Sequence, residues 1–177
     1  MPAEHAILGL LSLDDGTGHG YDLARNFAEG QPLATVLRLE PGMLYHHLKK
    51  LDRAGWVTSA KEQQANRPPR QVHQITEAGR AELHRWLREP VAHTREIRLE
   101  FLVKLYFAGR VDAALRGRLI AEQLETSRRL ESPLSDQTRR NAESDLPAEE
   151  REFMYLVLQL RLAQTRAAIV WLEQAAV

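Results

Sequence analysis

The segment from residue 41 to residue 57 constrains the fold of this chain more than any other. On a helical wheel at about 100° per residue, Leu44, Leu48 and Leu51 form one narrow apolar stripe. The proline at the start suits the first helical turn, where a missing N–H leaves no hydrogen bond unmade. Gly55 is suited to end the helix in a left-handed conformation. The segment therefore predicts a short amphipathic helix with one side packed on a core.

The opposite side of this predicted helix is polar and basic. His46, Lys49 and Arg53 lie opposite the leucines, with Tyr45 and Lys50 beside them. Histidine and tyrosine can contact base edges or thymine methyl groups, while lysine and arginine suit phosphates. A helix that merely keeps its surface solvated carries similar residues. The helix alone therefore leaves both interpretations open.

A predicted hairpin after this helix favours contact with nucleic acid. Residues 56–60 have strand character, and residues 71–75 alternate between polar and apolar side chains. The polar residues 61–70 between them are expected to form a projecting loop that carries Arg67 and Arg70. A helix with a basic side followed by a basic hairpin is typical of a DNA-binding surface, with phosphate contact expected of the arginines.

The composition is that of an ordinary globular chain with one locally basic region. Of the 177 residues, 44% are apolar and 27% are charged, which is enough for one domain with a full core or two small ones. The formal net charge is zero, yet residues 41–73 carry +4 and residues 1–40 carry −4. Cysteine is absent, and neither a secretory signal nor an apolar run of about 20 residues is found. We therefore expect a cytoplasmic protein without disulfides or a membrane span.

Helical patterns surround the predicted hairpin. Residues 3–13 and 20–28 read as helices before it, and residues 77–87 read as a helix after it with Thr76 as N-cap. The order helix, helix, helix, strand, strand, helix is that of a winged helix-turn-helix. We therefore expect a winged helix-turn-helix DNA-binding domain in residues 1–90.

The second half, residues 95–177, is expected to be an all-helical dimerisation domain. Helices are predicted over residues 97–108, 112–130 and 149–174, and residues 132–147 are predicted as a loop or linker because they are polar and contain two prolines. The final helix would be about 40 Å long and carry more apolar surface than its neighbours can cover, which predicts a twofold dimer. The residues expected at the dimer interface are Phe101, Leu105, Phe153, Leu156, Leu160, Ala163, Ala167 and Trp171.

Short motifs occupy nearly all of the first 88 residues. They are AILGLL at residues 6–11, HGYDL at 19–23, GMLY at 42–45 followed by LKKL and GWV, and TEAGR at 76–80. In this order they resemble the PadR-type transcriptional regulators. The resemblance implies a mostly α fold and a homodimer that binds an inverted-repeat operator in double-stranded DNA, usually as a repressor. The family commonly has proline directly after the Leu-Tyr pair, whereas this chain has His46, which indicates a different operator.

The resemblance and the helical wheel together define the expected DNA-binding residues. These are Tyr21, Gly42, Met43, Tyr45, His46, Lys49, Lys50, Arg53, Arg67 and Arg70.

Other functions have less support in the sequence. No catalytic motif, metal-ligand spacing or cofactor-binding glycine pattern is present, so we expect neither an enzyme nor a bound metal or cofactor. Aromatic residues of the second half could line a pocket for a small hydrophobic or aromatic effector, although they are more simply explained as core. The alternative function is a winged-helix protein-interaction module that does not bind DNA.

Overall fold

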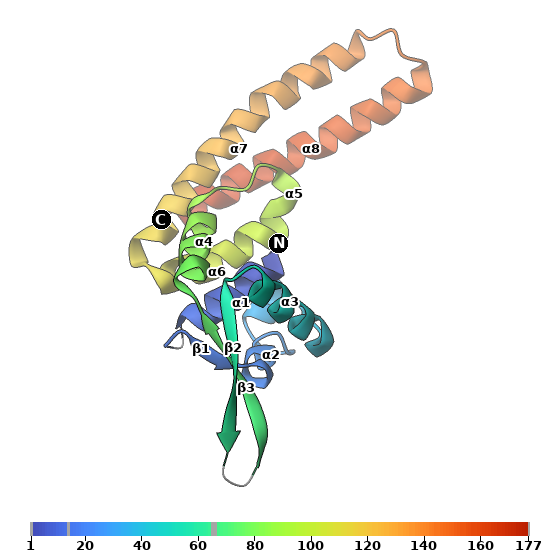
Figure 1. Ribbon diagram of the computed structural model, residues 1–177. Coiled ribbons are helices and arrows are strands. Elements are labelled where there is room, and N and C mark those ends of the chain that lie inside the picture. The colour runs from blue at the N-terminus through green and yellow to red at the C-terminus, as the bar shows by residue number, and fades with distance from the viewer. Residues whose placement is uncertain (1, 14, 65–66, 177) are drawn as a thin grey trace.

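The computed structural model describes residues 2–13, 15–64 and 67–176, and the side chains of all of these except residues 63, 64 and 67–69. The molecule is elongated (Figure 1). A long hairpin projects from one end and a pair of antiparallel helices projects from the other. The fold is mostly α with one small antiparallel sheet, as predicted.

The first half has the predicted order of a winged helix-turn-helix, with one additional strand. Its elements are α1 (Pro2–Leu13), β1 (Thr17–His19), α2 (Gly20–Arg25), the 3-10 turn η1 (Leu33–Thr35), α3 (Pro41–Arg53), β2 (Val57–Gln64), β3 (Arg67–Ile75) and α4 (Glu77–Arg88). Strand β1 was not predicted, because three residues after a glycine turn are too few to show a period of two.

The three strands lie in the order β1-β3-β2, and both pairs are antiparallel. Thr17 pairs with Gln74 on one side of β3, and Val57 pairs with Ile75 on the other. The predicted loop at residues 61–70 is wrong, because pairing continues outward as far as Glu62 with Arg70 and beyond. Side chains that face water on both sides of a ribbon show no alternation of polarity, so the sequence pattern cannot reveal this extension.

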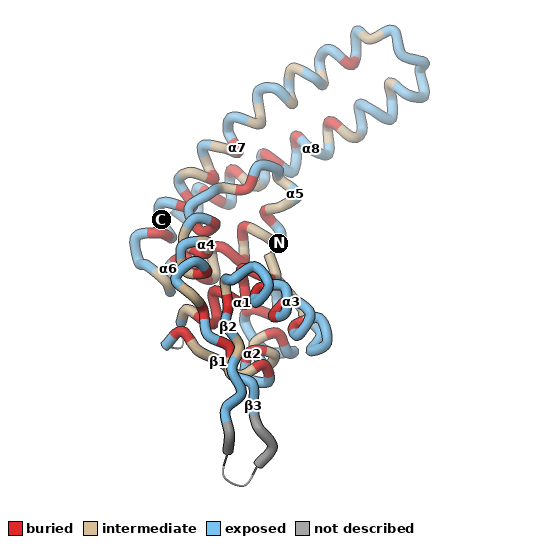
Figure 2. Tube along the Cα trace, in the orientation of Figure 1, coloured by how far each residue is buried: buried red, intermediate tan, exposed pale blue. Residues whose placement is uncertain are grey.

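Helix α1 lies at the centre of the core. Ala6, Ile7, Leu8 and Leu11 are completely inaccessible to solvent, and Figure 2 shows the buried residues concentrated around this helix. Helix α1 packs against α3, α4, α6 and the sheet. At Gly9 the packing is so close that an added Cβ would lie 2.6 Å from the ring of Phe107.

The second half is helical. It contains α5 (Thr94–Glu96), a π-helical turn η2 (Ile97–Phe101), α6 (Leu102–Val111), α7 (Ala113–Ala142) and α8 (Ala148–Ala175). The helix predicted over residues 97–108 thus begins earlier, after a capping box in which the His93 amide donates to Glu96 at 2.9 Å. Asp112 caps α7 as predicted, accepting from the Ala114 amide at 2.9 Å.

The prediction of a loop or linker over residues 132–147 is wrong for most of its length. Helix α7 continues through Pro133 to Ala142, and only residues 143–147 connect it to α8. A proline inside a helix costs about 3 kcal/mol. Contacts with α8 offset this cost, including a 2.7 Å ion pair from Arg166 to Glu131 and a 2.9 Å hydrogen bond from Asn141 to the Arg151 carbonyl. Across the described ranges, no helix is long and apolar enough to cross a membrane.

The start of α4 rests directly on the start of β2. The Thr76 hydroxyl accepts from the Gly79 amide at 3.0 Å and donates to the Gly55 carbonyl at 2.7 Å, which confirms Thr76 as N-cap. A Cβ at Gly79 would lie 2.2 Å from the Trp56 carbonyl oxygen. Because that oxygen belongs to the backbone, it cannot move aside without disturbing the sheet.

We expect Gly79→Ala to lower the free energy of unfolding by about 1–3 kcal/mol through this clash. The matched control is Gly117→Ala on α7, where an added Cβ meets nothing within 4 Å. There the better helix propensity of alanine predicts a gain of about 0.5–1 kcal/mol. Urea denaturation of both variants measures the difference, and equal stabilities would contradict the close approach at Gly79.

Candidate nucleic-acid interface

Helix α3 buries one side and exposes the other. Leu44, Leu48 and Leu51 are buried as the wheel predicts, and His47 is buried with them. The predicted DNA-binding residues of this helix all lie on the exposed side, with Met43 48% and Tyr45 44% exposed. The exposed residues are Gly42, Met43, Tyr45, His46, Lys49, Lys50 and Arg53.

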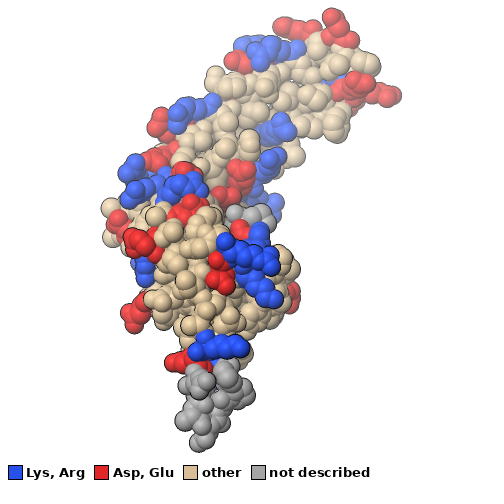
Figure 3. Space-filling model, in the orientation of Figure 1, with Lys and Arg blue, Asp and Glu red and all other residues tan. Residues whose placement is uncertain are grey.

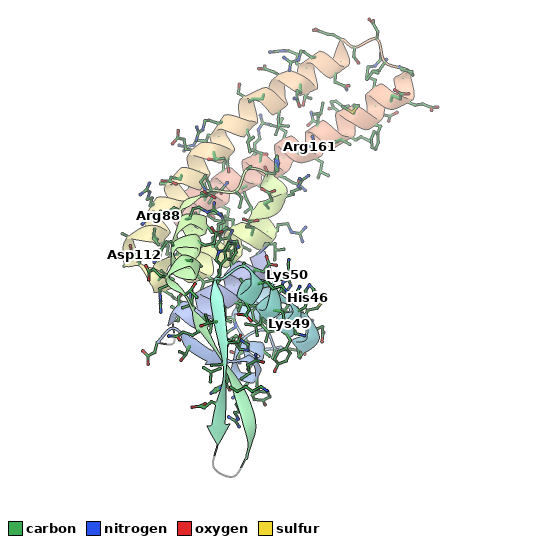
Figure 4. All side chains as sticks on the ribbon, in the orientation of Figure 1. His46, Lys49, Lys50, Arg88, Asp112 and Arg161 are labelled. Carbon is green, nitrogen blue, oxygen red and sulfur yellow. The ribbon has the colours of Figure 1, made fainter. Side chains whose placement is uncertain are left out.

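The exposed side of α3 is basic. Lysine and arginine side chains gather over this helix (Figure 3), and His46, Lys49 and Lys50 lie on its outer side (Figure 4). Among the residues that the structure describes, no ion pair engages Lys49 or Arg53. Their charges are therefore available to an anionic partner.

A buried carboxylate on α1 fixes the position of α3. Glu4 is 8% exposed, its Oε1 accepts from Lys50 Nζ at 2.6 Å, and it lies 3.2 Å from His47 Nδ1. Burial by itself raises the pKa of Glu4, but the hydrogen bonds from Lys50 and His47 outweigh burial, so the pKa falls below its ordinary value. Lys50 is thereby drawn towards α1, and its charge is partly neutralised by Glu4. Of the two adjacent lysines, only Lys49 keeps its full charge for an anionic partner.

Tyr45 extends from α3 across the start of α2. A Cβ at Gly20 would lie 2.6 Å from its ring, so a larger residue at this position would displace the Tyr45 side chain. Tyr21, which is 71% exposed, follows immediately. Tyr45, Tyr21 and Arg70 of β3 line one hollow of about 250 Å³. The structure thus brings together predicted residues from three separate elements.

The hairpin places basic residues beyond the body of the protein. Arg70 is exposed and stands opposite Glu62 in the β2–β3 ladder. The side chain of Arg67 lies outside the described residues, so its predicted contact stays a prediction. The base of the hairpin adjoins α2 through β1, which brings this basic strand close to Tyr45.

Two histidines at this surface were not predicted as site residues. His19 of β1 pairs with Val72, and its Nδ1 lies 3.4 Å from the Gln71 carbonyl oxygen. His73 of β3 is buried beside the same hollow. The sequence signal was the motif around His19, but the strand pairing that joins β1 to β3 is invisible in the sequence.

Helix α8 exposes a long apolar face. Phe153, Leu156 and Leu160 are each about 60% exposed, and Ala163 and Ala167 continue the face as predicted. Val170 follows the same helical rhythm and is 53% exposed, although it was not among the residues expected at the dimer interface.

The assignment of Phe101 to a dimer interface is wrong. Phe101 is completely buried within its own chain, where its ring meets Trp171 edge-on at 6.1 Å between centroids. Leu105 is half-buried and lines a different hollow, beside η1. Helical periodicity marks both residues as apolar-facing, but it does not tell which apolar faces the chain itself covers.

Two family models match most of the chain. Residues 7–85 match the transcriptional regulator PadR-like family, and residues 97–176 match the C-terminal region of virulence activator alpha. A probable transcriptional regulator from Mycobacterium tuberculosis is 31% identical over 99% of this chain and 96% of its own length. This chain belongs to the PadR-like family.

A further relative by sequence agrees with this membership. The negative transcriptional regulator PadR of Bacillus subtilis is 29% identical over 96% of this chain and 93% of its own length. The crystal structure of Bacillus subtilis PadR in complex with operator DNA shows 28% identity, covers 98% of this chain and 96% of its own, and has a TM-score of 0.47. The PadR-like family consists of transcriptional regulators, so the chain is a regulator and not an enzyme.

The Glu4 cluster gives a prediction about pH. Because the folded-state pKa of Glu4 lies below its ordinary value of 4.5, ionised Glu4 stabilises the fold above that pH. This stabilisation is lost as the pH falls through the lowered pKa. We expect Glu4→Gln to be less stable than the parent near neutral pH by about 1–3 kcal/mol. The deficit should shrink on acidification.

Urea denaturation at neutral and acidic pH tests this expectation. The matched control is Glu125→Gln on α7, whose side chain is 70% exposed and 3.7 Å from Arg129. Its effect should stay within about 0.5 kcal/mol. A deficit of Glu4→Gln that does not change with pH would show that lost packing, and not lost charge, is responsible.

Proposed function

We propose that this PadR-like protein binds double-stranded DNA as a homodimer and represses transcription from an inverted-repeat operator. The observation that carries the proposal is the basic, exposed side of α3 (Figure 3) beside a projecting hairpin that carries the exposed Arg70. A recognition helix inserts its first turns into the major groove, and the neighbouring element contacts the backbone. In this arrangement residues 1–90 bind DNA and residues 95–177 form the dimer.

The exposed residues of α3 divide between base reading and phosphate contact. His46 is exposed near the helix start, where it can meet a base edge. Gly42 has open space around it, so the backbone can approach the DNA closely there. Lys49 and Arg53 suit phosphates, and Met43 and Tyr45 offer apolar contact, with a hydroxyl on Tyr45. His46, in place of the family's common proline, is the residue we assign to this chain's own specificity.

The apolar face of α8 supports the homodimer. Phe153, Leu156 and Leu160 would leave a contiguous apolar surface in water if the chain remained single. A second copy covers it most simply through a twofold axis, in which the same face meets itself. Two α3 helices related by that axis match an operator whose half-sites form an inverted repeat.

Repression and release by an effector complete the proposal. Support for repression comes from the Bacillus subtilis relative, which is named a negative regulator. Support for an effector comes from a hollow of about 640 Å³ between η1 and helices α6 and α7. Leu102, Leu105 and Tyr106 give it an apolar part, and Arg110 and Arg116 add positive charge. This lining suits a small aromatic acid.

The central test is footprinting on the DNA upstream of the chain's own gene, followed by affinity measurements with variants. Lys49→Ala should weaken binding and make the slope of log K against log salt shallower by about one unit. Arg129→Ala on α7, with a side chain 69% exposed, is the matched control and should bind like the parent. Repeating the footprint with a panel of aromatic acids tests effector release.

Two further variants extend the test to the hairpin and to Tyr45 of α3. Arg70→Ala should also make the salt slope shallower by about one unit, and Tyr45→Ala should weaken binding without unfolding the protein. The assignment fails when all three variants bind DNA like the parent. Complete absence of salt-dependent affinity for any DNA would favour the protein-interaction module.

Dimerisation is tested separately by light scattering. The parent should have twice the chain mass of 20.2 kDa at micromolar concentration. Leu156→Glu with Leu160→Glu should give monomers, because two charges would be buried at the centre of the face. Leu146→Glu, at a leucine 39% exposed between α7 and α8, is the control and should remain dimeric. A monomeric parent would refute the interpretation of α8.

A further inference from the structure

His73 is a buried polar residue with one unused hydrogen-bonding atom. It lies in β3, is 3% exposed, and its Nδ1 lies 2.9 Å from the Ser59 hydroxyl on β2. Its Nε2 is buried and has no hydrogen-bond partner among the described side chains. Leaving such an atom unsatisfied costs about 1–3 kcal/mol. Native proteins rarely keep this arrangement without a reason.

His73 is one of the residues that line the hollow beside Tyr45. The hollow has a volume of about 250 Å³, and one water molecule occupies about 30 Å³ of liquid. A group of several heavy atoms therefore fits. The hollow lies between α2, α3 and β3, so it sits where the proposed recognition helix meets the base of the hairpin.

The lining of the hollow favours an anion. Arg70 contributes a fixed positive charge, and His19, Tyr21 and Tyr45 contribute side chains that can donate hydrogen bonds. Asp22, in the first turn of α2, is the one acidic residue in the lining, and it is exposed to solvent. Outside the lining, Glu62 lies 3.9 Å from His19 Nε2.

His73 can donate without being charged. Burial lowers the pKa of His73, Asp52 raises it by a smaller amount and His19 lowers it further, so the ring is neutral near pH 7. When Nδ1 accepts from the Ser59 hydroxyl, the single ring proton resides on Nε2. The unused atom is then an N–H donor of fixed position.

We propose that this hollow binds one backbone phosphate of each operator half-site, and that His73 Nε2 donates a hydrogen bond to it. Arg70 supplies the opposite charge, and Tyr21 and Tyr45 close the sides. The inference rests on the proposed DNA binding, and it adds His73 and His19 to the contact surface. A phosphodiester held between α3 and the hairpin would fix how deeply the recognition helix enters its groove.

A pair of substitutions at His73 separates the two nitrogens. His73→Asn keeps an amide near the position of Nδ1, so it can still bond Ser59 but cannot reach the hollow. His73→Gln extends to the position of Nε2 and can still donate there. We expect His73→Asn to weaken operator binding by about tenfold or more, and His73→Gln to stay within about threefold of the parent. Equal weakening in both variants, or none in His73→Asn, overturns the proposal.

Modified DNA tests the same contact from the other side. Single methylphosphonate linkages, which are uncharged, are placed in turn along each strand of the operator. At one position per half-site, the uncharged linkage should weaken DNA binding by the parent strongly. It should weaken binding by His73→Asn only slightly, because that variant has already lost the phosphate contact. Tyr21→Phe provides a second variant that keeps the fold, since Tyr21 is 71% exposed. DNA binding by Tyr21→Phe should become insensitive to the methylphosphonate at the same linkage. The proposal is overturned if no linkage affects the parent strongly and both variants only slightly.

Nuclear magnetic resonance of the histidine rings distinguishes the source of the phosphate. Operator DNA should shift the His73 Nε2 resonance, and inorganic phosphate compared with chloride at equal ionic strength should shift it far less. Equal shifts would assign the hollow to free phosphate instead of the DNA backbone. A parent that shows no salt-dependent DNA affinity defeats the proposed function, whereas a parent sensitive to Lys49→Ala but not to His73→Asn defeats this inference alone.

Discussion

The burial of α1 is the constraint on which the rest of the structure depends. Its apolar residues are buried on every side of the helix. Burial of apolar surface stabilises a fold by roughly 25 cal/mol for each Å² removed from water. The same helix carries Glu4, which binds α3, and His5, whose Nε2 lies 2.9 Å from Glu82 of α4 and whose ring stacks on Trp86 at 4.4 Å. Gly9 admits Phe107 of α6. Helix α1 therefore fixes α3 relative to the second half of the chain.

Charged residues in this protein serve two different purposes. Some hold elements together in partly or fully buried pairs. His5 of α1 contacts Glu82 of α4 at 2.9 Å and so joins the two helices. Hydrogen bonds to Glu82 from Arg85 of the same helix, and to a lesser degree from His5, lower the pKa of Glu82 to about 2 despite its burial. Lys104 is 2% exposed, and its Nζ donates to the Glu89 carbonyl at 2.6 Å, which ties α6 to the end of α4. Lys49 and Arg53 have no such partner among the described residues, which leaves them for an external anion.

Much of the winged half could be predicted because its decisive signals are local. The spacing of Leu44, Leu48 and Leu51 reports a helix with one side in the core, and the structure confirms which side is exposed. Thr76 and Asp112 cap helices within three residues of themselves, so neither depends on distant packing. Local signals fail at Pro133, where proline indicates a break. Packing of α7 on α8 keeps the helix intact.

The sequence by itself determined helix α3, its exposed side and the family, because all three rest on periodicity and on short motifs. Only the tertiary structure decided which residues from separate elements meet. Strand β1 joins His19 to the hairpin through backbone hydrogen bonds that depend little on side-chain type. Phe101 lies beneath Trp171 and not at a surface. The unused nitrogen of His73 exists only because Ser59, one strand away, engages the other. Such contacts join residues far apart in the chain, and no local pattern encodes them.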